Sequence, residues 1–297
     1  MASRNRSDRS HYLRNLVQRG IVGMLRRLPE PQRSRLAGWV SRRFIFNTHR
    51  DMALMLRNLD LIWPGQPAAE RAAIIHDVAT NVGVSALELF IDGALTEAST
   101  SASVEGPGLQ VIRDAAAEGR GAVLVTGHFG QFEVPRIYLK SIGLEVGGLY
   151  RDHVNPYLSA DVARVAERNG APIFPRGARG TRGLMKHLKG GGRIMLAIDQ
   201  KVPKADKLDF MGHPALTSTA AAEMALRYEV PMVPVFALRL PDQQGFRVIF
   251  ETPIAPASAE AMTLEFNARL GEMVRAHPGQ WLWNYDRWSL GKLKKAT

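Results

Sequence analysis

Apolar residues recur at helical spacing in the first hundred residues. Between His11 and Leu28 they lie three or four positions apart, the period of one helix face. They are Leu13, Leu16, Val17, Ile21, Met24, Leu25 and Leu28. A second helical pattern runs from Arg50 to about Ser101, and Trp63-Pro64-Gly65 interrupts it, because proline and glycine end helices. These patterns predict a helical N-terminal region over residues 1–105.

From about Gly108 onward, short apolar runs alternate with helical patterns. The runs that predict strands are 122–126, 144–150, 171–174, 193–198, 233–238 and 246–250. Helices are expected near 109–119, 131–142, 156–169, 180–190, 217–229 and 259–276. Strands that alternate with helices are typical of an α/β domain with a central sheet. We expect residues 106–297 to form this domain.

Positive charge is concentrated at the N-terminus. The first fifty residues hold twelve Arg, no Lys and two acids (Asp8 and Glu30), so they carry +10 of the net charge of +11. A basic amphipathic helix can bind an anionic membrane surface, or it can pack on the main domain with its Arg face in solvent. Both interpretations stay open. A nucleic-acid partner is not expected, since no nucleic-acid-binding signature accompanies the charge.

Several classes of site and location are disfavoured. The absence of cysteine excludes a disulfide framework and a thiol nucleophile. The eight His show no ligand spacing, so no metal site is expected. The apolar run 20–25 is too short for a signal peptide, and no run of about 18 uncharged apolar residues predicts a transmembrane helix. We therefore expect a protein of the cytoplasm or the cytoplasmic leaflet.

A His-x4-Glu pair, His128 and Glu133, follows the first buried strand of the predicted sheet. The carboxyl ends of strands are where α/β proteins place their sites, and Gly127 and Gly130 allow a tight turn and close approach of a ligand. The Glu133 carboxylate could accept a hydrogen bond from one imidazole nitrogen. The other nitrogen could then remove a proton from a hydroxyl. The pair could instead be structural and cap the following helix.

Further motifs accompany this pair in a fixed order. They are Gly127–Glu133, Tyr150-Arg151 with Asn155-Pro156, Pro175-Arg176-Gly177, Asp199-Gln200, Val233-Pro234 and the Trp-rich block 281–288. Over roughly residues 10–290 this series resembles the bacterial lipid A biosynthesis acyltransferases. These enzymes add lauroyl or myristoyl chains and belong to the lysophospholipid acyltransferase superfamily. Actinobacterial mannoside acyltransferases share much of the series.

The resemblance implies an α/β fold with a mixed central sheet flanked by helices, and it implies roles for single residues. His128 would be the general base and Glu133 its orienting partner. The residues implied to contact or adjoin the substrate are Arg151, Arg164, Arg168, Arg176 and Asp199. A guanidinium suits phosphate and sugar oxygens. Only one of Arg164 and Arg168 is expected in the site, and both could instead form a solvated helix face.

Trp281, Trp283 and Trp288 are expected to be core aromatics rather than catalytic groups.

The function implied is transfer of a fatty acyl chain from acyl carrier protein to a hydroxyl of a lipid A precursor. The donor is a phosphopantetheine thioester, and no bound cofactor or metal is expected. The enzyme would lie peripherally on the cytoplasmic face of the inner membrane. Two alternatives stay open: an acyltransferase for ornithine lipid, phosphatidylinositol mannoside or a lysophospholipid, with acyl-CoA as a further candidate donor, and a non-catalytic membrane-binding module.

Overall fold

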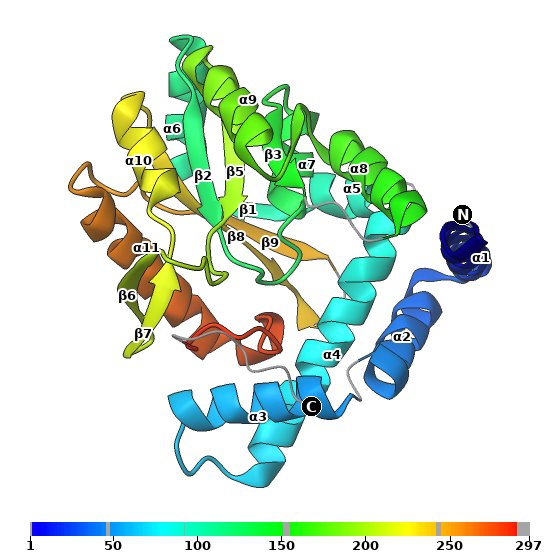
Figure 1. Ribbon diagram of the computed structural model, residues 1–297. Coiled ribbons are helices and arrows are strands. Elements are labelled where there is room, and N and C mark those ends of the chain that lie inside the picture. The colour runs from blue at the N-terminus through cyan, green and yellow to red at the C-terminus, as the bar shows by residue number, and fades with distance from the viewer. Residues whose placement is uncertain (1, 46–47, 92, 151–154, 242–244, 290–297) are drawn as a thin grey trace.

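The chain has an α/β architecture with a central seven-stranded mixed sheet and helices on both faces (Figure 1). The computed structural model describes residues 2–45, 48–91, 93–150, 155–241 and 245–289. The expected fold class is confirmed.

The strand order of the sheet is β1-β9-β8-β2-β5-β3-β4. The strands are β1 (Ser103–Glu105), β2 (Ala122–Thr126), β3 (Val146–Tyr150), β4 (Ile173–Pro175), β5 (Arg193–Ala197), β8 (Met232–Arg239) and β9 (Phe246–Phe250). β2 is parallel to both β5 and β8, β5 is parallel to β3, and β3 is parallel to β4. β8 and β9 are antiparallel. All six predicted strands are present, with ends that differ by at most two residues.

Three strands were not predicted from the apolar runs. β1 is only three residues long and half-exposed. β6 (Asp206–Phe210) and β7 (His213–Thr217) form a separate antiparallel hairpin. The hairpin has few consecutive apolar residues, because only alternate positions of each strand are buried.

The N-terminal region is helical, as expected. It contains α1 (Ala2–Leu25), α2 (Glu30–Val40), a π-helical turn (Ser41–Ile45), α3 (His49–Ile62), α4 (Ala68–Phe90) and α5 (Ala94–Thr100). The predicted break is confirmed, since α3 ends directly before Trp63. The remaining helices are α6 (Gly108–Ala117), α7 (Val134–Ser141), α8 (Pro156–Asn169), α9 (Ala178–Lys189), α10 (Ala220–Arg227), α11 (Ala259–Ala276) and the 3-10 turn η3 (Pro278–Gln280).

Both faces of the sheet are covered, so its central strand is apolar throughout. All five residues of β2 are buried. Val123 and Val125 belong to one core cluster, together with residues of α3, α4, α9, α10 and α11. Ala122 and Leu124 belong to a second cluster with residues of α5, α6 and α7. This alternation follows from the two-residue period of side chains along a strand.

Helices α3 and α4 contribute to the same core as the sheet. Leu59 and Val78 belong to the first cluster, and β1 precedes the expected boundary yet pairs with β9. The division into residues 1–105 and 106–297 therefore stays a prediction. By length and composition, α4 is one helix of the described chain that could cross a membrane, although no such helix was expected. Its face with Ile74, Ile75 and Val78 packs in the protein.

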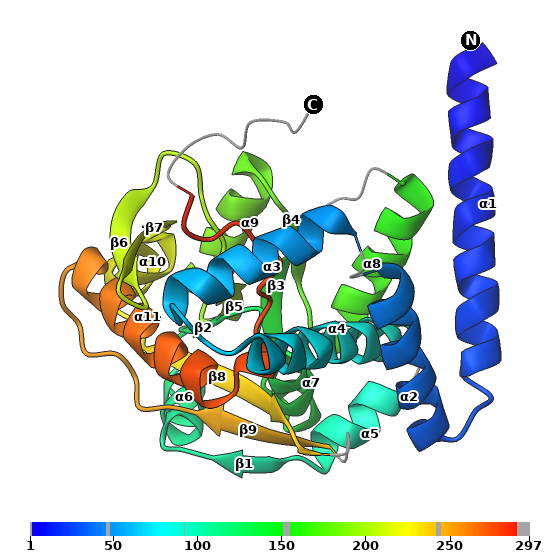
Figure 2. The ribbon, with the colours of Figure 1, turned by 90° about the horizontal axis from the view of Figure 1, so that it is seen from below.

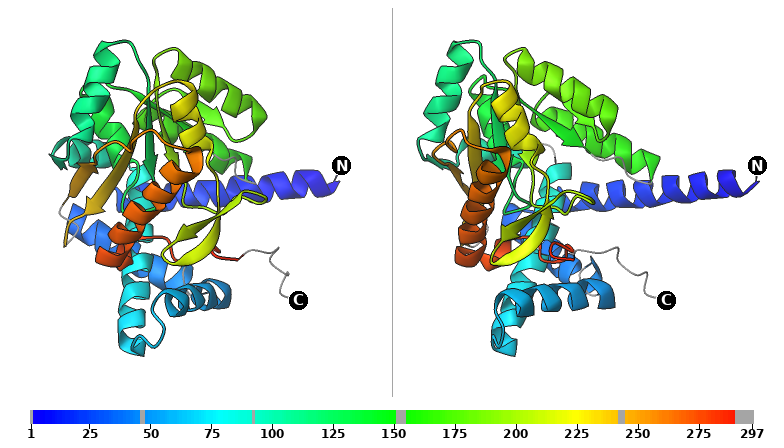
Figure 3. Two further views of the ribbon diagram at one scale, coloured as in Figure 1. Left: turned by 90° about the vertical axis from the view of Figure 1, so that its left-hand side faces the viewer. Right: turned by 60° about the vertical axis from the view of Figure 1, so that its left-hand side comes forward.

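Helix α1 docks on α8 and extends away from the body (Figures 2 and 3). Its contacts with α8 include polar ones, since Asn15 and Arg19 both donate to Asp161, and one aromatic contact, between the rings of Tyr12 and Tyr157. The apolar side chains Leu13, Leu16, Val17, Ile21 and Met24 remain 50–65% exposed. The helix therefore does pack on the main domain, but its apolar residues stay uncovered.

Candidate active site

The carboxyl ends of neighbouring parallel strands bring distant residues together. β2 and β5 pair along their full lengths, from Ala122 opposite Arg193 to Thr126 opposite Ala197. His128 stands two residues beyond β2, and Asp199 stands two residues beyond β5. The pairing thus places an imidazole beside a carboxylate that is 71 residues away in the chain.

Two hydrogen bonds join His128 to Asp199. The His128 Nδ1 lies 2.8 Å from Asp199 Oδ1, and the His128 backbone N–H donates to Oδ2 at 2.8 Å. Trp281 Nε1 also donates to Oδ2, at 3.0 Å. The Asp199 side chain is only 3% exposed, whereas that of His128 is 27% exposed. The carboxylate is therefore enclosed, and the imidazole retains an open side.

The hydrogen bonds assign the tautomer of His128. With the Nδ1 proton donated to Asp199, Nε2 is left as the acceptor. Gln200 Nε2 lies 3.3 Å from it. Burial works against the charged imidazolium, but the negative charge and hydrogen bond of Asp199 outweigh it and raise the pKa of His128. Burial likewise opposes ionisation of Asp199, but the charge and hydrogen bonds of His128, with a smaller part from Trp281, lower its pKa.

Glu133 does not occupy the expected place on the imidazole. It is the N-cap residue of α7, and its Oε2 accepts from Arg136 Nη1 at 2.7 Å and from Asn169 Nδ2 at 3.3 Å. Asp199, rather than Glu133, bonds His128 Nδ1. The expected hydrogen bond was wrong because the first turn of α7 brings Arg136 within reach of the Glu133 carboxylate. A catalytic contribution of Glu133 stays a prediction.

Two glycines permit the tight path of the chain around His128. Gly130 has φ +56°, and a Cβ there would lie 1.9 Å from the Ala237 carbonyl oxygen. A Cβ at Gly127 would lie 3.3 Å from Asp199 Oδ2. The glycines therefore allow close packing against β8 and against the carboxylate.

A cavity of about 190 Å³ opens beside His128. One wall is α4, which supplies Val78, Val82, Ala86 and Leu89. The opposite wall consists of the loop 128–132 and residues 279–282. The lining is mainly apolar, so the pocket suits a hydrocarbon chain whose reacting end lies at the imidazole.

A buried ion pair supports this cavity. Arg239 on β8 donates from both terminal nitrogens to the Glu88 carboxylate of α4, each at 2.7 Å. Gln131 Nε2 donates to the same carboxylate at 2.8 Å. The network fixes the His128 loop between α4 and the sheet, and no sequence pattern had indicated Glu88 or Arg239.

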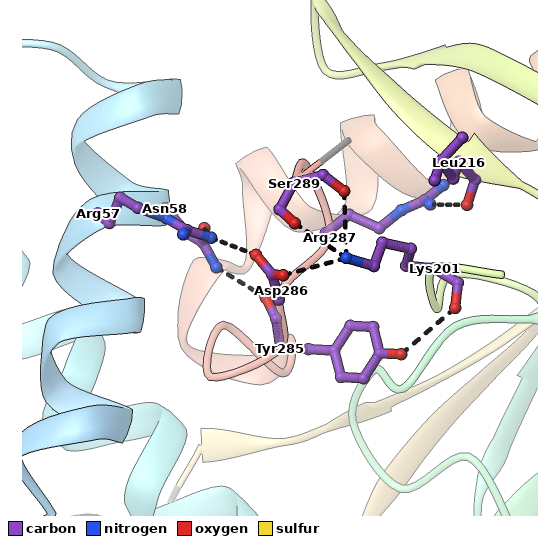
Figure 4. Close-up of polar contacts among 8 residues, drawn as sticks. All are labelled: Arg57, Asn58, Lys201, Leu216, Tyr285, Asp286, Arg287 and Ser289. Atoms are coloured by element: carbon purple, nitrogen blue, oxygen red, sulfur yellow. Dashed lines mark hydrogen bonds and ion pairs between the residues drawn. The ribbon is translucent and has the colours of Figure 1, made fainter. Parts of the chain in front are cut away.

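The C-terminal block holds the segment that follows Asp199 (Figure 4). Asp286 accepts from Arg57 of α3 at 2.5 Å and from Lys201 at 3.2 Å. Arg287 donates to the Leu216 carbonyl oxygen at 3.0 Å, and burial lowers its pKa to about 10, so it is charged at neutral pH. The block thereby joins α3, the hairpin β6–β7 and the Asp199 segment.

The three tryptophans of this block are buried, as expected for core residues. Their indole N–H groups donate to three different acceptors. Trp281 reaches Asp199, Trp283 reaches the Pro278 carbonyl oxygen and Trp288 reaches the Phe210 carbonyl oxygen. Trp281 thus combines a core position with a contact to the candidate site, which the sequence had not indicated.

The predicted substrate arginines lie in different places. Arg176 directly follows β4, at the same edge of the sheet as His128, and its side chain is exposed. Its backbone N–H donates to the Tyr150 carbonyl oxygen at 2.9 Å. Arg151 lies outside the described residues.

Arg164 and Arg168 both belong to α8. Arg164 pairs with Asp161 at 3.1 Å, and Arg168 donates to the Leu89 carbonyl oxygen at 2.7 Å. Leu89 lines the cavity beside His128, so Arg168 contacts the helix that forms the cavity wall. Substrate contacts by these arginines stay predictions. Within the described residues, no group of three or more His, Asp or Glu is arranged to hold a metal ion.

Comparison with known proteins indicates the same family as the ordered motifs do. Residues 5–289 match the family model described as bacterial lipid A biosynthesis acyltransferase. The chain is 24% identical over 276 residues to the lipid A biosynthesis lauroyltransferase of Escherichia coli (strain K12). The aligned region covers 90% of this chain and 89% of that protein. The chain is also 25% identical over 211 residues to the lipid A biosynthesis acyltransferase of Haemophilus influenzae (strain ATCC 51907 / DSM 11121 / KW20 / Rd), over 69% of this chain and 66% of that protein. Because the family model spans nearly the whole chain, the protein belongs to the bacterial lipid A biosynthesis acyltransferase family and is an O-acyltransferase.

Proposed function

We propose that the protein transfers a fatty acyl chain from the phosphopantetheine thioester of acyl carrier protein to a hydroxyl of a lipid A precursor, with His128 as general base. The observation that carries this proposal is the His128–Asp199 pair, of which His128 lines an apolar cavity. The family membership supports the acceptor class.

The chemistry follows from the free nitrogen of His128. Nε2 removes the proton of the acceptor hydroxyl while the hydroxyl oxygen attacks the thioester carbonyl carbon. The tetrahedral intermediate then collapses, the C–S bond breaks, and the proton held by His128 passes to the leaving sulfur. Asp199 remains ionised throughout, fixes the ring and stabilises the transient imidazolium. The acceptor hydroxyl displaces Gln200 from Nε2 before the attack.

The acyl chain occupies the cavity beside α4. Its apolar walls bury the methylene groups, each worth about 0.8 kcal/mol when fully removed from water. The carbonyl carbon can then lie beside the imidazole, because His128 itself lines the cavity.

The positive charge suits both substrates. Acyl carrier protein is acidic and a lipid A precursor is phosphorylated, so a basic enzyme face favours their association. Arg176, Arg164 and Arg168 are the described candidates for the acceptor's anionic groups, and Arg151 is a further candidate. Glu133 supports the site indirectly, through its bonds to Arg136 and Asn169.

We place the enzyme at the cytoplasmic face of the inner membrane. The uncovered apolar side chains of α1 and its arginines fit an amphipathic helix that lies in the lipid headgroup region. A peripheral attachment brings the site to the lipid acceptor and leaves it open to a soluble donor.

Transfer by the purified protein tests this function. Acyl carrier protein loaded with radiolabelled laurate is incubated with a lipid A precursor in detergent, and the acylated lipid is separated and counted. The wild-type protein should form product, and His128→Ala should form none while it remains folded, although its Tm should fall because the buried Asp199 loses the imidazole donor. Parallel reactions with acyl-CoA and with a lysophospholipid test the alternative donor and acceptor; preference for either would overturn that part of the proposal.

A further inference from the structure

One face of α9 carries a row of exposed basic side chains. Their positions are three, four and three residues apart, which places them on one side of the helix. They are Arg179, Arg182, Lys186 and Lys189, and all four are exposed. No acidic residue occurs between Glu167 and Asp199. We call these four residues the basic stripe of α9, and it extends about 15 Å along the helix axis.

The opposite face of α9 fixes the helix against the sheet. Gly180, Leu184 and Leu188 are buried and follow one another at every fourth residue. Leu184 and Leu188 belong to the first core cluster, together with residues of β2 and β5. A Cβ at Gly180 would lie 1.7 Å from the Pro175 carbonyl oxygen, so the start of α9 packs directly on the end of β4. The stripe therefore points away from the face of the sheet on which α9 lies (Figure 1).

The basic stripe lowers the stability of its own helix. Like charges three or four residues apart repel each other. Arg179 also lies in the first turn of α9, where the helix dipole disfavours a positive charge. Within the described residues, none of the four side chains forms an ion pair or a hydrogen bond. The described part of the chain thus does not offset this repulsion, which indicates a negatively charged partner outside it.

We propose that the basic stripe of α9 is the docking surface for acyl carrier protein. The inference rests on the proposed function and deepens it, because it assigns the acidic donor protein a place on the enzyme. Four cations in a row of about 15 Å suit a protein surface with several carboxylates, and the row is longer than one phosphate group requires. Complementary charge of this kind accelerates association and fixes the orientation of the partners.

The stripe begins at the edge of the sheet where the candidate active site lies. β2, β5, β3 and β4 are parallel neighbours, so their carboxyl ends share one edge. His128 follows β2 at this edge, and Arg179 lies four residues beyond Pro175, the last residue of β4. A carrier protein bound along α9 can therefore direct its phosphopantetheine arm along this edge toward the imidazole.

A membrane is the alternative anionic surface, and the side chains of α9 disfavour it. Among the described residues, the exposed large apolar side chains include five of α1, namely Leu13, Leu16, Val17, Ile21 and Met24, and none of α9. A helix in the headgroup region buries an apolar face in lipid, whereas the apolar face of α9 is already buried in the core. The two helices thus suit different partners: α1 suits a bilayer, and α9 suits a soluble acidic protein.

Arg182→Glu tests the inference, with Arg113→Glu as a matched control. Both arginines are exposed residues of a helix, and both substitutions change the net charge by the same amount. Arg113 belongs to α6, which packs on the opposite face of the sheet from α9. Binding of lauroyl acyl carrier protein is measured without an acceptor, from the fluorescence anisotropy of the labelled carrier. Arg182→Glu should raise the dissociation constant about tenfold or more, because like charges then face each other.

Arg113→Glu should leave this dissociation constant unchanged, and equal weakening by the two variants would overturn the proposal. The difference between them should shrink at high salt, because screening reduces the interaction of exposed charges. Lys186→Glu, one turn further along the stripe, should weaken binding in the same way. If neither stripe variant binds the carrier more weakly than Arg113→Glu does, the proposal is likewise overturned.

Thermal unfolding separates docking from folding. In Arg182→Glu the new carboxylate lies four residues before Lys186, the favourable order for an ion pair along a helix. The Tm of this variant should therefore equal or exceed that of the wild type while carrier binding weakens. A purely structural role of Arg182 would instead lower the Tm and the affinity together, which would count against the proposal.

Transfer kinetics give a second comparison. Arg182→Glu should raise the KM for lauroyl acyl carrier protein about tenfold with little change in kcat. It should leave the KM for lauroyl pantetheine unchanged, because this small donor lacks the acidic protein. An equal rise in KM for both donors would place Arg182 at the acyl or acceptor site and would overturn the docking surface.

Two further outcomes distinguish the partners and the proposals. If Arg182→Glu weakens flotation with phosphatidylglycerol vesicles more than Arg113→Glu does, but leaves carrier binding unchanged, the stripe binds membrane and the proposal is overturned. If the wild-type protein transfers no acyl chain to a lipid A precursor, the proposed function fails. Weaker carrier binding by Arg182→Glu than by Arg113→Glu still supports the docking surface in that case, whereas absence of carrier binding by the wild type overturns it.

Discussion

At the scale of single residues, the proposed role of His128 as general base depends on a carboxylate that burial alone would neutralise. Asp199 stays ionised because three donors converge on it: the imidazole, the His128 backbone N–H and the Trp281 indole. Removing any one of these donors leaves part of a buried charge unsatisfied, which costs more than the net contribution of an ordinary hydrogen bond. The site therefore couples the basicity of His128 to the C-terminal block of the chain.

Asp199→Asn should move the acid limb of the pH profile of kcat/KM. The base is active only when deprotonated, so activity rises as pH passes upward through the pKa of His128. Asp199 raises this pKa, and its neutralisation should therefore shift the limb to lower pH. Maximal activity should also fall, by about 10² to 10⁴. The measurement is kcat/KM from pH 5 to 9.

Glu133→Gln is the comparison for this prediction. It should leave the acid limb in place, whatever its effect on rate, because Glu133 bonds Arg136 and Asn169 rather than the imidazole. A shifted limb in Glu133→Gln together with an unshifted limb in Asp199→Asn would restore Glu133 as the orienting partner.

Trp281→Phe should reduce kcat more than Trp283→Phe does. Both indoles are buried, so both changes remove core volume and one hydrogen bond, at a cost of about 1–3 kcal/mol of unfolding free energy. Only Trp281 contacts Asp199; Trp283 donates to Pro278. Steady-state kinetics and thermal unfolding of the two variants separate catalysis from stability. Equal losses of kcat at equal Tm would reduce Trp281 to a core residue.

At the scale of helices and strands, the periodicity of the sequence predicts that an element is present better than it predicts which elements lie next to it. The strand 122–126 and the position of His128 after it follow from a buried apolar run. The partner of His128 does not, because an apolar run carries no information about strand order. The sequence favours Glu133, which is five residues away, whereas the parallel pairing of β2 with β5 brings Asp199 instead.

Helix α1 illustrates the same limit. Its amphipathic pattern is visible in the sequence, but the pattern is identical for a helix that packs on protein and for one that lies on a membrane. The docking contacts are the polar cluster around Asp161 and the ring contact of Tyr12 with Tyr157. No hydrophobic periodicity indicates contacts with residues about 142 positions away.

Asp161→Asn should release α1 from α8. The amide cannot reproduce the paired, charge-assisted bonds from Arg19, so α1 should open more often. Amide hydrogen exchange over residues 11–25 should accelerate about tenfold or more, while exchange in β2 stays unchanged. Glu167→Gln on the same helix is the control, since it removes an exposed acid. Unchanged protection of α1 in Asp161→Asn would show that other contacts hold it.

The contact between α1 and α8 should weaken only at acidic pH. The folded-state pKa of Asp161 is lowered, so its contribution is complete above the ordinary carboxyl pKa of about 4. It is lost only as pH falls through the lowered value. Docking of α1 should therefore be constant around neutral pH.

At the scale of the whole molecule, charge and exposed apolar surface are both concentrated in the N-terminal region. Residues 1–50 carry +10 of the net +11, and α1 extends from the side of the body (Figure 3). Leu89 of α4 lines the cavity beside His128, and the next residue, Phe90, lines a pocket between α1 and α8. Attachment through α1 would thus orient the site toward the lipid acceptor.

Replacing Leu13, Val17 and Met24 together with Ser should remove the part of membrane binding that salt does not screen. All arginines remain in this variant. Each side chain is at least half exposed, and since full burial of such a side chain is worth about 1.5–3 kcal/mol, each should contribute roughly 1 kcal/mol in a bilayer. Affinity for vesicles that contain anionic lipid should fall about 10²-fold at 1 M salt, where the screening length is about 3 Å. Binding at low salt should fall less, because the arginines still attract the surface.

Ile142→Ser, at an exposed apolar position on the body, should leave flotation unchanged. If the triple variant floats at 1 M salt as well as the wild type does, α1 is not the hydrophobic anchor, and the apolar mouth of the cavity beside His128 becomes the membrane contact to test.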